Sequence, residues 1–208
     1  MSRTVGPARK SYAEWIDKSR QIPSGMKWFS SLAALTTIGV FACGATIVPR
    51  LSVEEMVVRS ELILSGRVTG TWAAWDRHHQ FIWTHTEITV EDVVKGTHSD
   101  RVVVSEPGGV VDGLGMLIAG TPVYVQGERV MLFLERMPNG YLRTTGMGQG
   151  KLSISPNGSV HLTYAGADLF RAGNRPEGTA LQSLDATSAT EVRRRVADLA
   201  NGGTGRAR

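Results

Sequence analysis

Short β-favouring runs separated by turn residues fill the middle of the chain, and this pattern constrains the fold most strongly. Residues 62–70 and 101–105 are rich in aliphatic side chains, and residues 82–94 alternate between apolar and polar side chains. A period of two is typical of a strand with one buried and one solvated face. Because no helical pattern separates these runs, the sequence predicts an all-β domain, either a sandwich or a barrel.

Two turn sequences predict hairpins in the second half of this region. Pro138-Asn139-Gly140 and Pro156-Asn157-Gly158 each interrupt β-favouring residues, and Asn-Gly is a strong hairpin signal. We expect a further short strand at residues 123–125. The glycines of residues 146–150 are followed by a strand pattern and not by a helix. We therefore interpret them as sites of a bulge or of close packing and not as a phosphate-binding loop.

Helix signals flank the β-rich region on both sides. Ser52 supplies a hydroxyl at a cap position, and a carboxylate follows three residues later. This capping box predicts a short helix near residues 52–60. Residues 190–199 are expected to form a C-terminal helix. Residues 165–187 have the composition of a surface loop, and residues 201–208 that of a disordered tail.

An uncharged apolar run precedes the β-rich region. Lys27 supplies a basic residue, residues 28–41 form the apolar run, and Ala42 and Cys43 end it with small side chains. This order is that of a secretory signal. The segment that ends at Cys43 resembles a bacterial lipobox, in which the cysteine receives a diacylglyceryl group. The resemblance implies a lipoprotein that is anchored to a membrane and lies in the cell envelope, outside the cytoplasm.

Other interpretations of the apolar run stay open. It also fits an ordinary cleaved signal, an uncleaved membrane anchor or a core helix. The anchor is possible because about 20 residues cross ~30 Å of hydrocarbon. The polar residues 1–25 are either a cytoplasmic tail or lie upstream of the true start, in which case Met26 initiates the protein. The predicted organisation is a signal or anchor segment at 26–45, a β-barrel domain at 46–187, and a helix with a tail at 188–208.

The distribution of charge argues against nucleic acid as a partner. The formal net charge of the chain is +4, and residues 1–45, with six Lys/Arg against two Asp/Glu, account for all of it. A nucleic-acid-binding domain needs a basic surface on its folded part. The one basic cluster beyond residue 45 is Arg193-Arg194-Arg195. Since Cys43 is the only cysteine, no disulfide can form within the chain, and the core must come from apolar burial.

Two motifs suggest a family for the β domain. In residues 60–68, an acidic residue and a group of aliphatic residues precede Gly, one variable residue and Val. Residues 86–96 end in an aliphatic residue followed by Lys and Gly. These motifs resemble the opening of netrin-like domains, a family that includes the tissue inhibitors of metalloproteinases. The resemblance covers roughly residues 43–105. It implies an OB-like Greek-key barrel such as uncharacterised exported bacterial proteins carry.

The resemblance also implies an alternative function, that of a secreted protease inhibitor. In the inhibitors of this family, an N-terminal cysteine chelates the zinc of the protease through its amino group and carbonyl. Signal cleavage would make Cys43 N-terminal. However, Ala45 occupies the place of the family's second cysteine, so the disulfides that rigidify the inhibitory segment are absent.

Aromatic residues and histidines gather between residues 72 and 85. The candidate ligand- or partner-binding residues are Trp72, Trp75, His78, His79 and Phe81, which we expect in a loop, with Trp83 either beside them or in the core. Aromatic residues on loops suit contact with a ligand more often than catalysis. The sequence therefore predicts a non-catalytic binding or structural role without a cofactor, with a protein or glycan of the envelope as partner.

A metal-dependent enzyme is the other alternative. His85 and Glu87 share one predicted strand face and could present a nitrogen and a carboxylate to one ion. An exposed strand face normally carries polar side chains, however, and the neighbouring Glu91 and Asp92 point to opposite faces, which argues against an acid–base pair. The sequence has no Gly-x-Ser-x-Gly nucleophile motif. We therefore predict no catalytic residue and no metal site.

Overall fold

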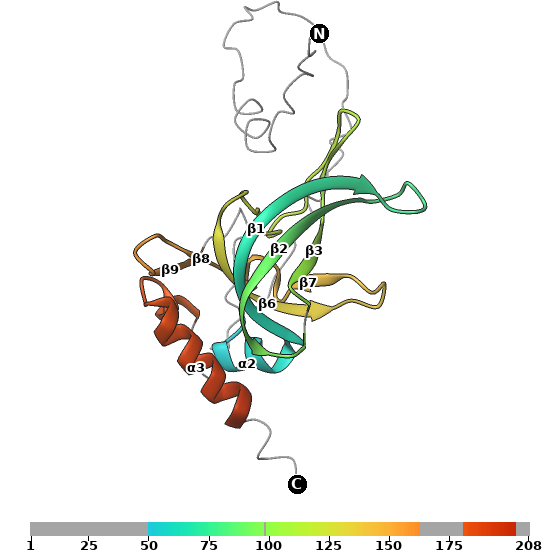
Figure 1. Cartoon of the computed structure of the whole chain (residues 1–208). Helices are drawn as coiled ribbons and strands as arrows, with labels where there is room; N and C mark the ends of the chain where they lie inside the picture. The colour runs from blue at the N-terminus through green and yellow to red at the C-terminus, as the bar shows by residue number, and fades with distance from the viewer. Residues whose placement is uncertain (1–49, 98, 163–180, 203–208) are drawn as a thin grey trace, which may run out of the picture. The chain divides into compact units, whose positions relative to one another are not determined.

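The computed structural model describes residues 50–97, 99–162 and 181–202, and strands predominate in them (Figure 1). The elements are α2 (Val53–Arg59), β1 (Leu62–Trp75), β2 (Ile82–Lys95), β3 (Arg101–Pro107), β4 (Gly109–Val111), β5 (Leu114–Met116), β6 (Arg129–Arg136), β7 (Leu142–Thr144), the 3-10 helix η1 (Met147–Gly150), β8 (Lys151–Ile154), β9 (Val160–Leu162), the 3-10 helix η2 (Leu181–Leu184) and α3 (Ala189–Gly202). The chain is mostly β with two α-helices in these residues, as the sequence predicts.

Seven strands form one mixed sheet in the order β1-β2-β3-β7-β6-β8-β9, and β1 also pairs with β6. The pairs are antiparallel except for β3 and β7, which meet in parallel at Val104 and Leu142. Each of β1, β2, β3, β7 and β6 therefore has a strand neighbour on both sides. Strands β4 and β5 form a separate two-stranded sheet.

The pairing of strand β1 with β2 is irregular near Gly66 and Gly70. Its register with β2 shifts at Ser65/Gly66 and again at Val68/Gly70. A Cβ on Gly66 would lie only 2.4 Å from the carbonyl oxygen of Thr89, so no other residue fits without a shift of the backbone. Both long strands, β1 and β2, curve together in Figure 1. Between Ile63 and Arg67, β1 pairs with β2 on one edge and with β6 on the other.

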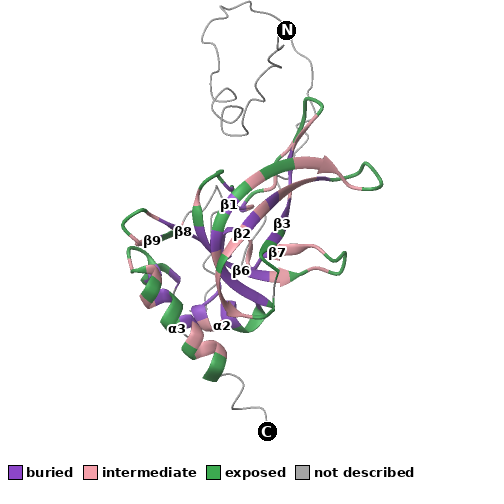
Figure 2. Cartoon of the chain, viewed as in Figure 1, coloured by how far each residue is buried: buried purple, intermediate pink, exposed green. Residues whose placement is uncertain are grey.

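Two apolar clusters lie on opposite faces of the same strands, so that both faces of β6 are buried (Figure 2). Val130, Leu132 and Leu134 of β6 belong to the inner cluster, together with residues of β1, β2 and β3. Met131 and Phe133 point the other way, to the outer cluster that α2 and α3 cover. The period of two along a strand thus supplies both cores from one segment.

The helices begin and dock as their sequences indicate. Ser52 accepts a hydrogen bond from the Glu55 backbone, and the Glu55 carboxylate accepts one from the Ser52 backbone, which completes the predicted capping box. At the other end of α2, the Lys95 ammonium donates to the carbonyls of Val57 and Ser60, at 2.8 and 2.7 Å. These contacts fix α2 to the end of β2.

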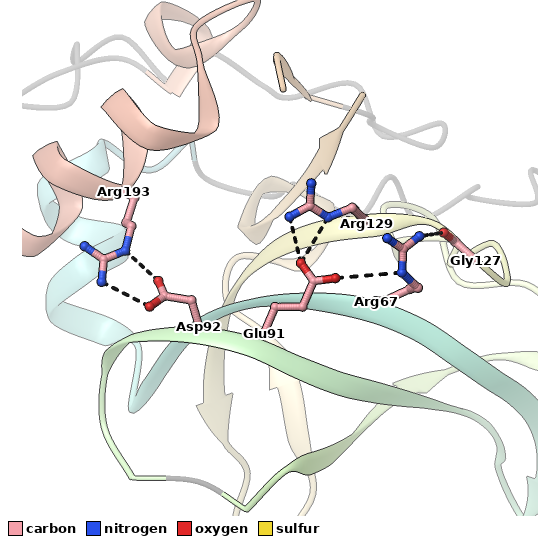
Figure 3. Close-up of polar contacts among 6 residues, drawn as sticks. All are labelled: Arg67, Glu91, Asp92, Gly127, Arg129 and Arg193. Carbon is pink, nitrogen blue, oxygen red and sulfur yellow. Dashed lines mark hydrogen bonds and ion pairs between the residues drawn. The ribbon is translucent and has the colours of Figure 1, made fainter. Parts of the chain in front are cut away.

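Surface ion pairs join α3 and three neighbouring strands (Figure 3). Arg193 of α3 binds both carboxylate oxygens of Asp92, at 2.6 and 3.0 Å. Glu91 lies between Arg129 of β6, at 2.7 Å, and Arg67 of β1, at 3.7 Å. Because these groups are solvent-exposed, we expect each pair to contribute little to stability. Part of the basic cluster noted in the sequence therefore serves to position a helix.

Three sequence predictions need correction. Residues 123–125 form no strand: the Val123 carbonyl accepts from the Lys151 ammonium at 2.7 Å, and Tyr124 is buried in the inner cluster. The predicted loop at Trp72 and Trp75 is strand, because β1 continues to Trp75. The predicted loop at 165–187 contains η2.

Several predictions fall outside the described residues. These are the polar leader, the signal segment with Cys43, most of the loop at 165–187 and the end of the tail. Among the described helices, none has both the length and the apolar character needed to cross a membrane.

Candidate functional site

Four aromatic rings from three segments meet on the outward side of β1 and β2. The rings of Trp72 and His85 have centroids 5.4 Å apart, and Tyr141 lies edge-on to His85 at 5.6 Å and to Trp83 at 5.0 Å. Trp72 is 43% exposed, and the other three are half-buried. We call these four residues the outer aromatic face.

The register of the strands produces this face. Trp72 is directly opposite His85, and Ala74 is opposite Trp83, so that one side of the β1–β2 pair carries all three rings. Ile82 and Ile88 of β2 point to the other side and are buried. Ala74 leaves room beside Trp83 for a ring from elsewhere. Tyr141 comes from the turn before β7, which lies next to β3 in the sheet.

His85 is held as a neutral hydrogen-bonding group. Its Nδ1 lies 2.8 Å from the hydroxyl of Ser105, on the neighbouring strand. Burial lowers the pKa of His85, because desolvation disfavours the imidazolium. The ring therefore stays uncharged to lower pH than an exposed histidine.

A buried carboxylate lies next to Ser105 along β3. Glu106 is only 2% exposed and accepts a hydrogen bond from the Thr144 backbone at 2.7 Å. Arg143 is 3.4 Å from the same carboxylate. Burial raises the pKa of Glu106, although the Thr144 amide and the Arg143 charge oppose this rise. Glu106 thus joins β3 to β7 through protein contacts.

His85 and Glu87, the residues of the alternative metal hypothesis, each have a protein partner. His85 contacts Ser105, whereas the Glu87 carboxylate accepts from the Thr69 hydroxyl at 2.9 Å and lies 3.5 Å from Arg101. In the parts of the chain that the structure describes, no three His, Cys, Asp or Glu side chains converge as metal ligands would.

The other predicted binding residues lie at the tip of the β1–β2 hairpin. Trp75 stacks on His79 with centroids 6.1 Å apart. Asp76 organises the turn, because its carboxylate accepts from the backbone amides of Gln80 and His78, and these bonds lower its pKa. Phe81 is 50% exposed. Of the five predicted residues, only Trp72 therefore belongs to the outer aromatic face, and the other four lie at the hairpin tip.

Sequence reasoning missed Tyr141 and left Trp83 undecided. A period-two pattern continued from residues 82–94 does place Trp83 on the same side as His85, so that signal was available. No local signal could have placed Tyr141, because its position depends on the contact between β3 and β7. No protein-family model matches the chain, and no curated protein matches it in sequence.

Proposed function

We propose that this chain is a non-catalytic binding protein whose outer aromatic face holds a neutral glycan. The observation that carries the proposal is the convergence of Trp72, Trp83, His85 and Tyr141 from three segments, with Trp72 exposed. An aromatic ring attracts the C–H groups of a sugar through the negative charge of its face. The exposed ring of Trp72 and the rings beside it suit a ligand that is apolar on one side.

We further propose that the domain is a closed OB-like barrel, as the netrin-like resemblance implies. The support is the cycle of pairings in which β1, β2, β3, β7 and β6 each have two neighbours, with one parallel contact between β3 and β7. An OB barrel binds ligands on its second and third strands and on the loops after its first and fourth strands. Trp83, His85 and Tyr141 occupy corresponding places, which is an analogy of fold.

The charges beside the face favour a neutral ligand. Glu106 is buried and hydrogen-bonded, and Glu87 lies beside Arg101. His85 has a lowered pKa and is neutral at physiological pH. An anionic polymer would need cations along the face to replace its counterions. A neutral ligand loses little free energy of binding when it covers these groups, because it has no charge to desolvate.

Replacing Trp72 with alanine should weaken glycan binding by about 5- to 140-fold, because an aromatic contact of this kind is worth about 1–3 kcal/mol and each 1.4 kcal/mol is ten-fold. The measurement is the dissociation constant for the neutral oligosaccharide retained best from a glycan array. The thermal transition should hardly change, since Trp72 is exposed.

Phe81→Ala is the matched control, because Phe81 is exposed to a similar degree but lies at the hairpin tip. We expect it to bind like the parent chain. If no neutral oligosaccharide is retained, or if Trp72→Ala binds as the parent does, the glycan proposal is wrong.

We also propose export and lipidation at Cys43, which the apolar run and its small-residue end support. Replacing Cys43 with serine should release the protein from the membrane fraction or halt its processing, because a hydroxyl cannot form the thioether. The intact mass of membrane-extracted protein measures the acyl groups, the cleavage site and the start residue together. An unchanged mass and unchanged membrane retention in Cys43→Ser would contradict lipidation.

A further inference from the structure

The outer half of β1 has a free edge among the described residues. Strand β6 pairs with β1 only between Leu62 and Arg67, whereas β2 pairs with it as far as Trp75. In Figure 1 the two long strands extend together as an arm away from β6. The edge that faces away from β2 is therefore without a strand partner from Gly70 to Trp75.

The hydrogen-bonding alternation identifies the backbone groups on this edge. The Ile82 carbonyl accepts from the Gly108 amide, on the side of β3. Backbone groups alternate along a strand, so Trp83 and His85 direct theirs to β1, at Ala74 and Trp72. It follows that the residues of β1 that alternate with these partners direct their amides and carbonyls outwards, away from β2. They are Thr71, Ala73 and Trp75.

Beyond the bulge at Val68/Gly70, this edge has no charged residue or proline to prevent pairing. Natural edge strands are blocked by lysine, proline, inward-pointing charges or a covering segment. The sequence from Gly70 to Trp75 is Gly-Thr-Trp-Ala-Ala-Trp, without charge or proline. Thr71 and Trp72 are exposed. An exposed edge of this composition adds another strand through main-chain hydrogen bonds.

We propose that the edge pairs with the same edge of a second copy of this chain, antiparallel about a two-fold axis at Ala73. In this register Ala73 pairs with Ala73 of the other copy, and Thr71 pairs with Trp75. All three outward residues then exchange both of their hydrogen bonds. A slip by two residues leaves Thr71 or Trp75 opposite a residue outside this set, so the arrangement is the one that satisfies the whole edge.

The side chains fit the same register. Trp72 lies opposite Ala74 and Trp75 opposite Thr71, so each large ring meets a small residue, and the two central side chains are methyl groups. Because the axis is perpendicular to the sheet, both outer aromatic faces lie on the same side of the pair. The dimer thus joins them into one surface, on which Trp72 of each copy adjoins Ala74 of the other.

Sedimentation equilibrium of the full chain in non-ionic detergent tests the dimer. We expect twice the mass of one chain, and a return to the monomer mass in Ala73→Pro. Proline removes an outward donor there but no hydrogen bond to β2. Val58→Ser, at an exposed position of α2, should remain a dimer. A monomeric parent chain, or a dimer that Ala73→Pro leaves intact, would overturn the proposal.

A disulfide tests the register without proline. Trp72 and Ala74 form a non-hydrogen-bonded pair across the axis, so cysteines there place their Cβ atoms within disulfide reach. Oxidation of a mixture of Trp72→Cys and Ala74→Cys chains should join the peptides that contain residues 72 and 74, as mass spectrometry identifies. In the control, Trp72→Cys chains are mixed with Val58→Cys chains, whose cysteine is at an exposed position on α2. Oxidation of this mixture should not join the peptides that contain residues 72 and 58. Equal joining in the two mixtures, or none in the first, contradicts this register.

Discussion

Replacing Glu128 with glutamine should lower the free energy of unfolding by about 3 kcal/mol at neutral pH, because it leaves a buried ammonium group without its counter-charge. Lys151 is only 2% exposed, and its Nζ lies 2.8 Å from Glu128 and 2.7 Å from the Val123 carbonyl. The ammonium also lies 5.2 Å from the centre of the Tyr124 ring. These contacts hold the segment before β6 against the inner cluster.

The loss should depend on pH. Burial lowers the pKa of Lys151 in the folded protein, and Glu128 opposes this shift. Between the lowered pKa and the ordinary value of 10.5, the unfolded chain binds more protons, so stability rises with pH in this window. Without Glu128 the folded pKa falls further and the window begins at lower pH. The difference between parent and Glu128→Gln should therefore shrink as the pH approaches 10.5.

Urea unfolding at neutral pH and at about pH 10 measures both effects. Lys151→Met in the Glu128→Gln background is the control, because it removes the unpaired charge with a side chain of similar length. We expect it to recover most of the lost stability, as replacement of buried ion pairs by apolar groups commonly does. A loss below about 1 kcal/mol in Glu128→Gln, equal at both pH values, would show that Lys151 does not depend on this carboxylate.

Replacing Phe133 with alanine should lower the free energy of unfolding by about 3–5 kcal/mol, through lost burial and the cavity that remains. Phe133 is fully buried on the side of β6 that faces α2 and α3. Its neighbours in the outer cluster come from both helices and from β8, which cannot all close on the cavity. The measurement is urea unfolding followed by tryptophan fluorescence.

Phe81→Ala provides the comparison with the same loss of volume. Phe81 is half-exposed at the hairpin tip, and we expect a change within about 0.5 kcal/mol. Similar losses in the two variants would mean that the helices do not pack on β6 as described. A large loss in Phe133→Ala alone would establish the outer cluster as a second core of the domain.

Local signals in the sequence were sufficient for most individual elements. The capping box at Ser52, the two Pro-Asn-Gly hairpins and the alternation in residues 82–94 all occur in the structure. Each depends on side chains only a few residues apart. The prediction failed at residues 123–125, where apolar composition suggested a strand. There the Val123 carbonyl accepts a hydrogen bond from the Lys151 side chain, and the segment pairs with no strand among the described residues.

The candidate site was only partly predictable, for a related reason. Trp72 was identified, but in a loop, because the length of β1 depends on its pairing with β2 and not on its own composition. Composition also gathered Trp75, His78, His79 and Phe81 with it, since they are close in sequence. A strand separates its two faces and its ends, so closeness in sequence did not become closeness on one surface.

The sequence by itself determined the β class of the domain, the positions of its turns and the side of β2 that is solvated, because these depend on local periodicity and on turn residues. Only the tertiary structure decided that β1 pairs with both β2 and β6, that β7 meets β3 in parallel, and that Tyr141 joins Trp83 and His85. The physical reason is that these pairings join residues far apart in the chain. The buried area and hydrogen bonds of the whole sheet select them, and no short segment contains that information.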